Sequence, residues 1–389
     1  MKKRKPRILL TEGSSLTSRE TLTALHKCGY ESDFMSSTRL PMSALSWWRH
    51  KVIHTVDANK APRTYLKHIA YLLKNGEYDA ILPTHEEAWL LAEGKDYLPH
   101  NAPIAIATPA AFAQTQSKIG FALLLDELEL PQPKWQELGR DLPGELTYPV
   151  WLKYEYGTAG RGVRKLRSKR QIEEAISTLS QQKANRLMLQ ADMPGRYGQV
   201  GAVFRHGKLL AVHASLQTGV GVGGSAAARK SVHLPTAYAH IQKIGQHLCW
   251  HGPLTLDFIL KNGKPYYIEC NPRMVEPANA YMAGVNFPDL LIRLSTGCKI
   301  SGDVKIGARG VKTHSMEALL LGIAETAGKR MDILHTVRAY TRDKGSKEVL
   351  KPITKDLPSA IPVLAGFASL MFRPKSGSRV AGKAVQTYR

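Results

Sequence analysis

The sequence predicts an α/β and α+β protein: an N-terminal domain with a doubly wound parallel sheet, then α+β subdomains, then a basic C-terminal region. Three observations support this prediction. Apolar runs alternate with helical patterns up to residue 115, the later strand-like runs turn on glycine-rich hairpins, and the last part of the chain is strongly basic. Strands that are separated by helices pair in parallel, because a parallel connection needs a long crossover.

The first domain is predicted to span residues 1–115. Strand-like runs begin with RILL (7–10) and include APIAIAT (102–108), while helical patterns over 18–28 and 62–75 each end at a glycine. The polar loop TEGSS follows the first strand and precedes a helix, so we expect either an anion or ligand site or simply a capped turn. It lacks the G-x-G-x-x-G spacing, which leaves a dinucleotide cofactor without support.

The bulk composition points to an anionic partner. The net charge of +22, from 54 Lys and Arg against 32 Asp and Glu, suits a nucleotide, a nucleic acid, an acidic lipid or an acidic polymer. The four cysteines have no C-x-x-C spacing, which favours a reduced cytoplasmic protein without a zinc site. No run is typical of a signal peptide or a transmembrane span, so we expect a cytoplasmic protein, with peripheral attachment to the inner face of the membrane as the alternative.

The segment LTLDFILKNGKPYYIECNPR (254–273) holds the strongest candidate site. It predicts two strands around an Asn-Gly turn, with Glu269, Asn271 and Arg273 on one face of the second strand because side chains alternate along a strand. If Asp257 joins them, two carboxylates and an amide oxygen converge, which suits Mg²⁺ carrying nucleotide phosphates. The alternative is a half-buried hairpin whose polar face meets water.

The length of the loop decides whether Asp257 lies on this face. A three-residue loop, Lys261-Asn262-Gly263, pairs residues of like parity and places Asp257 diagonal to Glu269. A two-residue turn would place Asp257 opposite Ile268 and leave Glu269 on the other face. The sequence therefore predicts a loop with an odd number of residues if the metal site exists.

Two glycine-rich segments precede this hairpin. A strand at 148–154 carries Lys153 near its end, and GTAGRGV (157–163) and a further strand follow. Glycine lets backbone N–H groups approach an anion, so the pattern is typical of a flap over phosphates, with an ordinary hairpin turn as the alternative. The second segment, QTGVGVGGSAAARK (217–230), is predicted as a mobile loop that presents charge, because it is too irregular for a strand.

In their order along the chain these features resemble the ATP-grasp superfamily, in the branch that includes biotin carboxylase, carbamoyl-phosphate synthase and many carboxylate–amine ligases. The resemblance covers about residues 1–300 and rests on two lysines, the glycine loop, a hinge at 190–193 and the run ECNPR (269–273). It implies a preliminary α/β domain over 1–115 and an ATP-grasp domain of two α+β subdomains over 116–300. Residues 301–389 match no pattern of this family.

The resemblance also implies roles for particular residues. Gln199 is a departure, because the family often has glutamate there, and the run Met274–Pro277 replaces the usual small residues. The implied phosphate contacts are Lys118, Lys153, Gly157, Thr158, Gly160 and Gly162; the implied adenine hinge is Gln190, Ala191 and Met193; the implied magnesium ligands are Asp257, Glu269 and Asn271; and the implied catalytic residues are Arg273, Arg229 and Lys153.

The implied reaction is ATP-dependent formation of an amide or peptide bond between small-molecule carboxylate and amine substrates, through an acyl phosphate. The alternatives are an ATP-grasp enzyme that modifies a protein or envelope polymer at a membrane surface, and a non-catalytic nucleotide-binding protein. A nucleic-acid partner is not favoured, because no stacking platform or helix-turn-helix pattern occurs. If the protein forms an oligomer, we expect a homodimer, because dimers are the commonest soluble oligomers.

Residues 301–389 carry sixteen Lys and Arg against seven Asp and Glu, and suit an anionic membrane surface or an acidic polymer. The apolar run LPSAIPVLAGFASLMFR (357–373) is expected either as a terminal helix packed on the protein or as a segment lying in a membrane surface. The residues after 373 are predicted to be a disordered basic tail.

Overall fold

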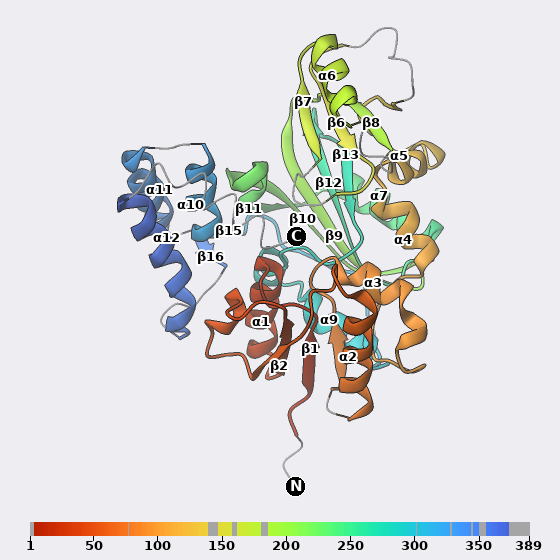
Figure 1. Cartoon of the computed structure of the whole chain (residues 1–389), viewed down its shortest axis with the longest axis vertical. Helices are drawn as coiled ribbons and strands as arrows, with labels where there is room; N and C mark the ends of the chain where they lie inside the picture. Colours follow the sequence, from red (N-terminus) through yellow and green to blue (C-terminus); the bar gives the residue numbers. More distant parts are fainter. Residues whose placement is uncertain are drawn as a thin grey trace.

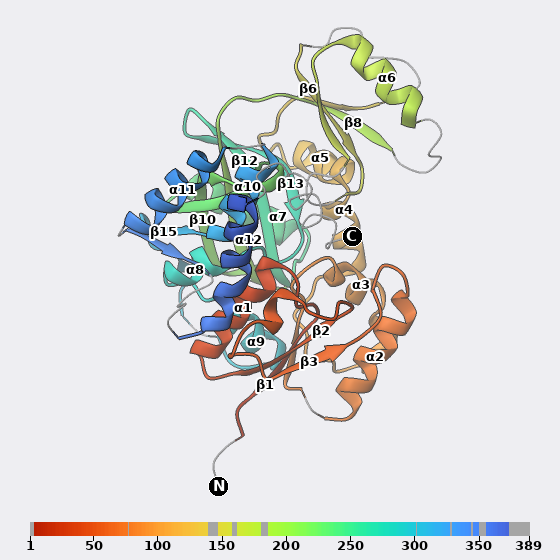
Figure 2. The ribbon, with the colours of Figure 1, turned by 60° about the vertical axis from the view of Figure 1, so that its left-hand side comes forward.

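A computed structural model arranges the chain around three sheets, an N-terminal sheet, a small sheet and a large sheet (Figure 1). The structure describes residues 4–76, 78–138, 147–157, 162–179, 186–300, 302–326, 329–343, 345–349 and 355–372. The small sheet stands apart from the N-terminal sheet, and the large sheet lies between them (Figure 2).

The N-terminal sheet is parallel throughout, with the order β3-β2-β1-β4, so the predicted doubly wound topology is confirmed. Ile8 and Leu10 pack with α1, and Leu9 packs on the opposite face with α2, which explains the continuous apolar run of the first strand. The elements are β1 (Arg7–Leu10), α1 (Leu16–Lys27), β2 (Glu31–Ser36), η1 (Met42–Ala44), β3 (Lys51–His54), α2 (Pro62–Lys74), β4 (Ala80–Leu82), α3 (Glu87–Glu93) and η2 (Lys95–Tyr97).

The strand predicted at 102–108 is wrong. This segment runs beside β4 but makes one ladder-like bond, from the Ile81 N–H to the Pro103 carbonyl at 2.9 Å. Prolines at 103 and 109 have no N–H to donate, so the segment cannot sustain strand pairing at its ends.

The small sheet is antiparallel, with the order β5-β8-β6-β7, and α6 covers one face through Ile172. Strands β6 and β7 are the two predicted strands on either side of the glycine-rich segment, and they pair antiparallel. The elements that lead into and form this part are α4 (Pro109–Gln116), α5 (Lys118–Glu127), β5 (Trp135–Glu137), β6 (Val150–Tyr154), β7 (Val163–Leu166), α6 (Lys169–Leu179) and β8 (Leu187–Ala191).

The large sheet has the order β13-β12-β9-β10-β11-β15-β16, and β14 pairs with β10. Helix α9 packs between this sheet and the N-terminal sheet, so that Leu291 shares one core with Ile8 and Val203. The elements are β9 (Arg196–Arg205), β10 (Lys208–Val220), η3 (Val222–Gly224), β11 (Ala226–Val232), α7 (Pro235–His247), β12 (Gly252–Lys261), β13 (Lys264–Asn271), α8 (Ala278–Met282), α9 (Phe287–Ser295), β14 (Lys305–Ile306), β15 (Lys312–His314) and β16 (Ser346–Glu348).

The loop predicted over 217–230 is instead the end of β10, a short turn and β11. Small residues are required here because the hairpin packs tightly: a Cβ at Gly219 would meet the Tyr340 hydroxyl at 2.4 Å, and Ala228 is buried. Low β propensity of glycine and alanine is therefore overridden by tertiary packing.

The C-terminal helices form a separate apolar cluster in which Leu320, Ile333 and Leu370 are buried. Strands β15 and β16 extend the large sheet from β11, and the predicted domain boundaries stay predictions. The elements are α10 (Met316–Glu325), α11 (Arg330–Arg342), η4 (Leu357–Ala360) and α12 (Ile361–Phe372). No helix of the described ranges is long and apolar enough to cross a bilayer, and the predicted tail after residue 373 lies outside the described residues.

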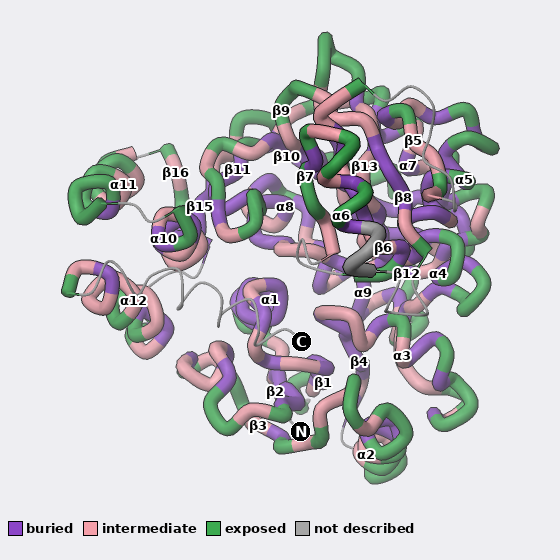
Figure 3. The backbone as a smooth tube through the Cα atoms, turned by 45° about the horizontal axis from the view of Figure 1, so that its top comes forward, coloured by how far each residue is buried: buried purple, intermediate pink, exposed green. Residues whose placement is uncertain are grey.

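Helix α1 is buried along most of its length, in contrast to α11 (Figure 3). Arg19 of this helix forms an ion pair with Asp356 at 2.5 Å, and both side chains are almost fully buried. The other oxygen contacts of Asp356 come from the Ser46 hydroxyl and the Trp47 N–H, each at 2.7 Å. The C-terminal region is thereby attached to the N-terminal domain.

Asp356→Ala should lower the free energy of unfolding by about 3–5 kcal/mol, because it leaves the buried Arg19 guanidinium without its counter-charge. Chemical denaturation monitored by circular dichroism measures this change. Asp303→Ala, at an exposed position, is the matched control and should change it by less than about 0.5 kcal/mol. A loss as small as that of the control would show that the ion pair contributes nothing.

Candidate functional site

The hairpin of β12 and β13 has a two-residue turn. Asn262 and Gly263 have φ of 51° and 76°, and Lys261 pairs with Lys264. These positive φ values are those of a type I′ turn, which suits the Asn-Gly pair. The predicted three-residue loop is therefore wrong.

A β-bulge nevertheless brings the carboxylates together. Phe258 pairs with Tyr267, but the residue before it, Asp257, pairs with Glu269. Ile268 is therefore the extra residue of β13. The bulge shifts the register by one residue and returns Asp257 and Glu269 to the same face. The sequence predicts a diagonal arrangement of the two carboxylates, whereas in the structure they lie directly opposite each other.

The third predicted metal ligand lies beside this pair. Asn271 pairs across the hairpin with Thr255, and its side-chain amide donates to Asp257 Oδ2 at 3.2 Å. The structure thus brings Asp257, Glu269 and Asn271 into one polar group at the end of the hairpin.

Two buried lysines reach the same group from the small sheet and its leading helix. Lys118, the first residue of α5, has its Nζ 3.1 Å from Glu269 Oε1 and donates to the Gly157 carbonyl at 2.7 Å. Lys153 of β6 donates to the carbonyl of the bulged Ile268 at 3.1 Å. The bulge therefore both aligns the carboxylates and presents a carbonyl to a lysine.

Burial lowers the pKa of Lys153 to about 8, and the charge of Glu269 partly opposes that shift. Its ammonium also donates to Gln190 Oε1 at 2.7 Å, since β6 pairs with β8. Of the predicted hinge, Gln190 is thus in contact with the lysine, while Ala191 and Met193 are half-buried at the end of β8. Thr158 and Gly160 of the predicted flap lie outside the described residues, and Gly162 follows them with φ of 70°.

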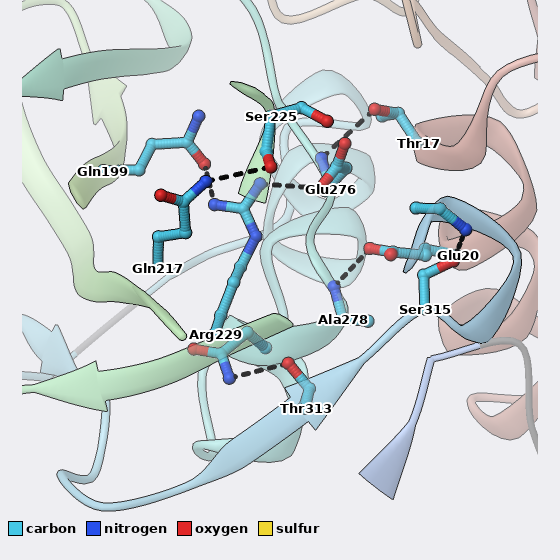
Figure 4. A network of polar contacts seen from close by, with 12 residues as sticks. Thr17, Glu20, Gln199, Gln217, Ser225, Arg229, Glu276, Ala278, Thr313 and Ser315 are labelled. Atoms are coloured by element: carbon cyan, nitrogen blue, oxygen red, sulfur yellow. Dashed lines mark hydrogen bonds and ion pairs between the residues drawn. The ribbon is translucent and has the colours of Figure 1, made fainter. Parts of the chain in front are cut away.

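Arg229 is connected to Asp257 through Gln199, and Figure 4 shows the contact between Arg229 and Gln199. The Gln199 amide donates to Asp257 Oδ1 at 2.8 Å and accepts from Arg229 Nη1 at 2.8 Å. Arg229 Nη2 forms an ion pair with Glu276 at 2.6 Å. An amide can donate to one partner and accept from the other, which a carboxylate cannot do, so the departure at 199 has a defined local use.

Helix α1 supports the loop that carries Glu276. The Thr17 hydroxyl accepts from the Glu276 N–H at 3.1 Å, and Glu20 accepts from the Ala278 N–H at 2.8 Å (Figure 4). Burial raises the pKa of Glu20 well above its usual value, and the nearby Glu276 charge raises it further. The N-terminal domain thus fixes the position of Arg229.

Arg273 joins the site to the end of β4. Its guanidinium lies 3.1 Å from Glu86 Oε1, and its Nη2 is 3.5 Å from Asn271 Oδ1. Glu86 was not among the predicted site residues; the signal for it was the pair Glu86–Glu87, which comes shortly after the apolar run that ends at Leu82. The carboxyl end of a parallel strand is a common place for ligand-binding side chains.

Two more carboxylates lie at this edge of the N-terminal sheet. Glu12 follows β1 and accepts from the Ser14 N–H at 2.6 Å, and Glu87 begins α3 after β4. Burial raises the pKa of Glu87 to about 8, and the charge of Glu12 adds to the shift. Within the described ranges, one Glu87 oxygen is buried without a hydrogen-bond partner. The chain passes from β1 to β2 and β3 on one side of β1, and then crosses to β4 on the other side. The carboxyl ends of β1 and β4 are therefore the switch point of the sheet.

Comparison with known proteins relates the whole arrangement to a known fold. No family model matches the chain. The carbamoyl phosphate synthase large chain of Deinococcus deserti is 23% identical over 306 residues, which cover 72% of this chain and 27% of that protein. The chain therefore spans about a quarter of the length of this relative.

Solved structures match over much more of their length. An ADP complex of N5-carboxyaminoimidazole ribonucleotide synthetase has a TM-score of 0.62 at 16% identity and covers 87% of both chains. The biotin carboxylase domain of 2-oxoglutarate carboxylase from Hydrogenobacter thermophilus, solved with MgADP and bicarbonate, has a TM-score of 0.61 at 15% identity, covering 79% of this chain and 73% of that one. L-amino acid ligase from Bacillus licheniformis has a TM-score of 0.57 at 15% identity, covering 76% and 75%.

This chain has the ATP-grasp fold. The predicted parallel N-terminal sheet and ATP-grasp fold are confirmed, with the small sheet and the large sheet as the two subdomains of that fold, while the separate basic C-terminal region stays a prediction.

The polar group between the two ATP-grasp subdomains suits a hard divalent cation. Asp257, Glu269 and Asn271 offer carboxylate and amide oxygens, the ligands that Mg²⁺ prefers. Burial, together with the charge of the facing Glu269, raises the pKa of Asp257 to about 6, and a cation there would offset the charges of both carboxylates.

Proposed function

We propose that this protein is a Mg²⁺-dependent ligase that consumes ATP to join a carboxylate to an amine through an acyl phosphate. The observation that carries the proposal is the convergence of Lys118, Lys153 and Asp257 around Glu269, between the two ATP-grasp subdomains. The fold that the chain shares with a synthetase, a carboxylase and an amino acid ligase supports the same reaction class.

In the proposed reaction a carboxylate oxygen attacks the γ-phosphorus of ATP, and ADP leaves. The amine nitrogen then attacks the acyl carbon, and inorganic phosphate leaves. Both steps move negative charge between oxygen atoms, so the protein contributes mainly positioning and charge neutralisation. Mg²⁺ held by Asp257, Glu269 and Asn271 would offset the charge of the phosphate oxygens.

The chain's own residues divide this work. Lys118 and Lys153, together with backbone N–H groups of the glycine-rich turn from Gly157, would hold the phosphates, because ammonium groups and amide donors bind phosphate oxygens strongly in a buried site. The backbone around Ala191 and Met193 would meet the adenine.

The substrates would lie between the large sheet and the switch point of the N-terminal sheet. Arg273 stands there between Asn271 and Glu86, and its remaining N–H groups would bind the carboxylate that is to be activated. Arg229 would act beside it, held by Gln199. An ammonium ion bound there would be complementary to Glu12 and Glu87 and would favour their ionised forms, whose pKa values burial raises.

The pH dependence of nucleotide binding should report Lys153. Its ammonium must be protonated to attract phosphate, and its pKa of about 8 means that the charge is present below pH 8 and lost above it. We therefore expect ATP affinity to fall by about tenfold between pH 7 and pH 9 at constant Mg²⁺. Calorimetry measures this fall, and a Lys153→Met variant should lack it; equal pH profiles in both proteins would contradict the assignment.

The test of the proposed function is ADP release across a panel of amino acids and small carboxylates with and without amines, followed by mass spectrometry of the products. We expect ADP release that requires one carboxylate, and an amide product when the amine is added. ATP binding without carboxylate-dependent ADP release across the panel would favour a non-catalytic nucleotide-binding protein.

A second candidate role is attachment to an anionic membrane surface through α12. Leu364 and Phe372 are 63% and 80% exposed on this helix, and Lys355 precedes it. Vesicles containing phosphatidylglycerol should then carry the protein upward in flotation at low salt and release it at high salt. Leu364→Ser with Phe372→Ser should abolish flotation; wild-type protein that stays at the bottom would exclude this role.

A further inference from the structure

A pocket of about 510 Å³ lies between the end of α1 and the start of the C-terminal helices. His26, Lys27, Trp48 and Lys355 line it. None of them contributes to the ATP-grasp site, so the pocket needs a separate explanation. Its volume is in the range of pockets that bind small molecules.

The pocket is strongly basic and lacks acidic partners. Burial lowers the pKa of Lys27, and the positive charges of Lys347 and Lys355 lower it further. In the described part of the chain, no carboxylate forms an ion pair with Lys27, Lys347 or Lys355. Lys27 instead lies 5.3 Å from the ring centroid of Tyr281. Gathering three ammonium groups without counter-charge costs free energy, which a bound anion would remove.

Asp356, which follows Lys355 and whose charge acts on His26, is already engaged. It is fully buried, and its two oxygens accept from Arg19, from the Ser46 hydroxyl and from the Trp47 N–H. The charge of Asp356 therefore compensates Arg19, and Asp356 forms no ion pair with the lysines next to the pocket.

One side of the pocket is aromatic. The rings of His26 and Trp48 stack with centroids 4.6 Å apart and planes within 4°. Burial lowers the pKa of His26, and the charge of Asp356 partly opposes that shift. An aromatic side next to a basic one suits a ligand that has an organic part and an anionic part.

We propose that this pocket binds a small phosphorylated molecule, with its phosphate between Lys27 and Lys355 and its organic part against the His26–Trp48 pair. Two ammonium groups match the double negative charge of a phosphate monoester, and Lys347 adds to the attraction. The ligand would connect α1, in the N-terminal domain, to the segment that begins the C-terminal helices, and so it would stabilise the folded chain.

The probe is inorganic pyrophosphate, titrated by calorimetry without Mg²⁺. All proteins carry Lys153→Met, which weakens competing binding in the ATP-grasp site. Adding Lys27→Ala with Lys355→Ala should weaken pyrophosphate binding at least tenfold and remove the rise in melting temperature that pyrophosphate causes. The matched control is Lys67→Ala with Lys74→Ala, at two exposed positions on α2. This double substitution removes the same charge and should leave the affinity for pyrophosphate within twofold of its parent.

The proposal is overturned if the pocket variant binds pyrophosphate as tightly as its parent, or if the α2 control loses as much affinity as the pocket variant. Vesicles of phosphatidylglycerol distinguish a lipid headgroup from a soluble ligand. If vesicles bind through Lys27 and Lys355 and pyrophosphate does not, a small soluble ligand is excluded. These readouts measure binding alone, so they stand or fall independently of ligase activity.

Discussion

Glu269→Gln and Asp257→Asn should each reduce the rate of ADP release by about 10²–10³-fold or more, with little change in melting temperature. Each substitution keeps the shape of the side chain but removes one of two facing carboxylate charges. The remaining oxygens would hold Mg²⁺ weakly and leave phosphate charge without compensation. A coupled assay for ADP with the substrate found in the panel measures the effect.

Glu93→Gln is the control for this prediction, because Glu93 is exposed at the end of α3 and away from the hairpin. The Glu93→Gln variant should release ADP at the wild-type rate. Normal turnover in both Glu269→Gln and Asp257→Asn would mean that the metal ligands have been misassigned.

Lys153→Met should weaken ATP binding by about tenfold or more, since it removes a buried ammonium from the phosphate position. Methionine fills a similar volume, so the strand β6 and its core neighbours Val150 and Leu152 should stay in place. Calorimetry with ATP and Mg²⁺ measures the change. Lys169→Met on the exposed face of α6 is the control, and unchanged affinity in the Lys153 variant would contradict its phosphate role.

The sequence was informative where a pattern is local. Alternation along 254–273 placed Glu269 and Asn271 on one face, and Lys153 at the end of a strand before a glycine-rich turn is where the structure has it. The parallel N-terminal sheet also followed from alternating strands and helices. These features depend on residues that are close in sequence, which is why they could be predicted.

Register was harder to predict. The Asn-Gly pair correctly marked a turn, but a two-residue turn alone would have separated Asp257 from Glu269. The bulge at Ile268 has no sequence signal of its own, because its extra residue is accommodated by the neighbouring strand and by the contact with Lys153. A correct conclusion about which residues converge was thus reached with a wrong loop.

Pairs far apart in sequence were not predictable from local patterns. Arg19 and Asp356 are 337 positions apart, and Glu86 meets Arg273 across 187 positions. The strand at 226–232 was missed for a related reason, since its alanines form a strand only because other parts of the chain pack on them.

The most direct test of the proposed chemistry follows one oxygen atom. The carboxylate substrate is labelled with ¹⁸O and turned over with ATP, Mg²⁺ and the amine, and the inorganic phosphate is examined by mass spectrometry. An acyl phosphate intermediate predicts that each phosphate released carries one oxygen from the carboxylate, in step with ADP and amide. Unlabelled phosphate, or release of AMP and pyrophosphate in place of ADP, would contradict it.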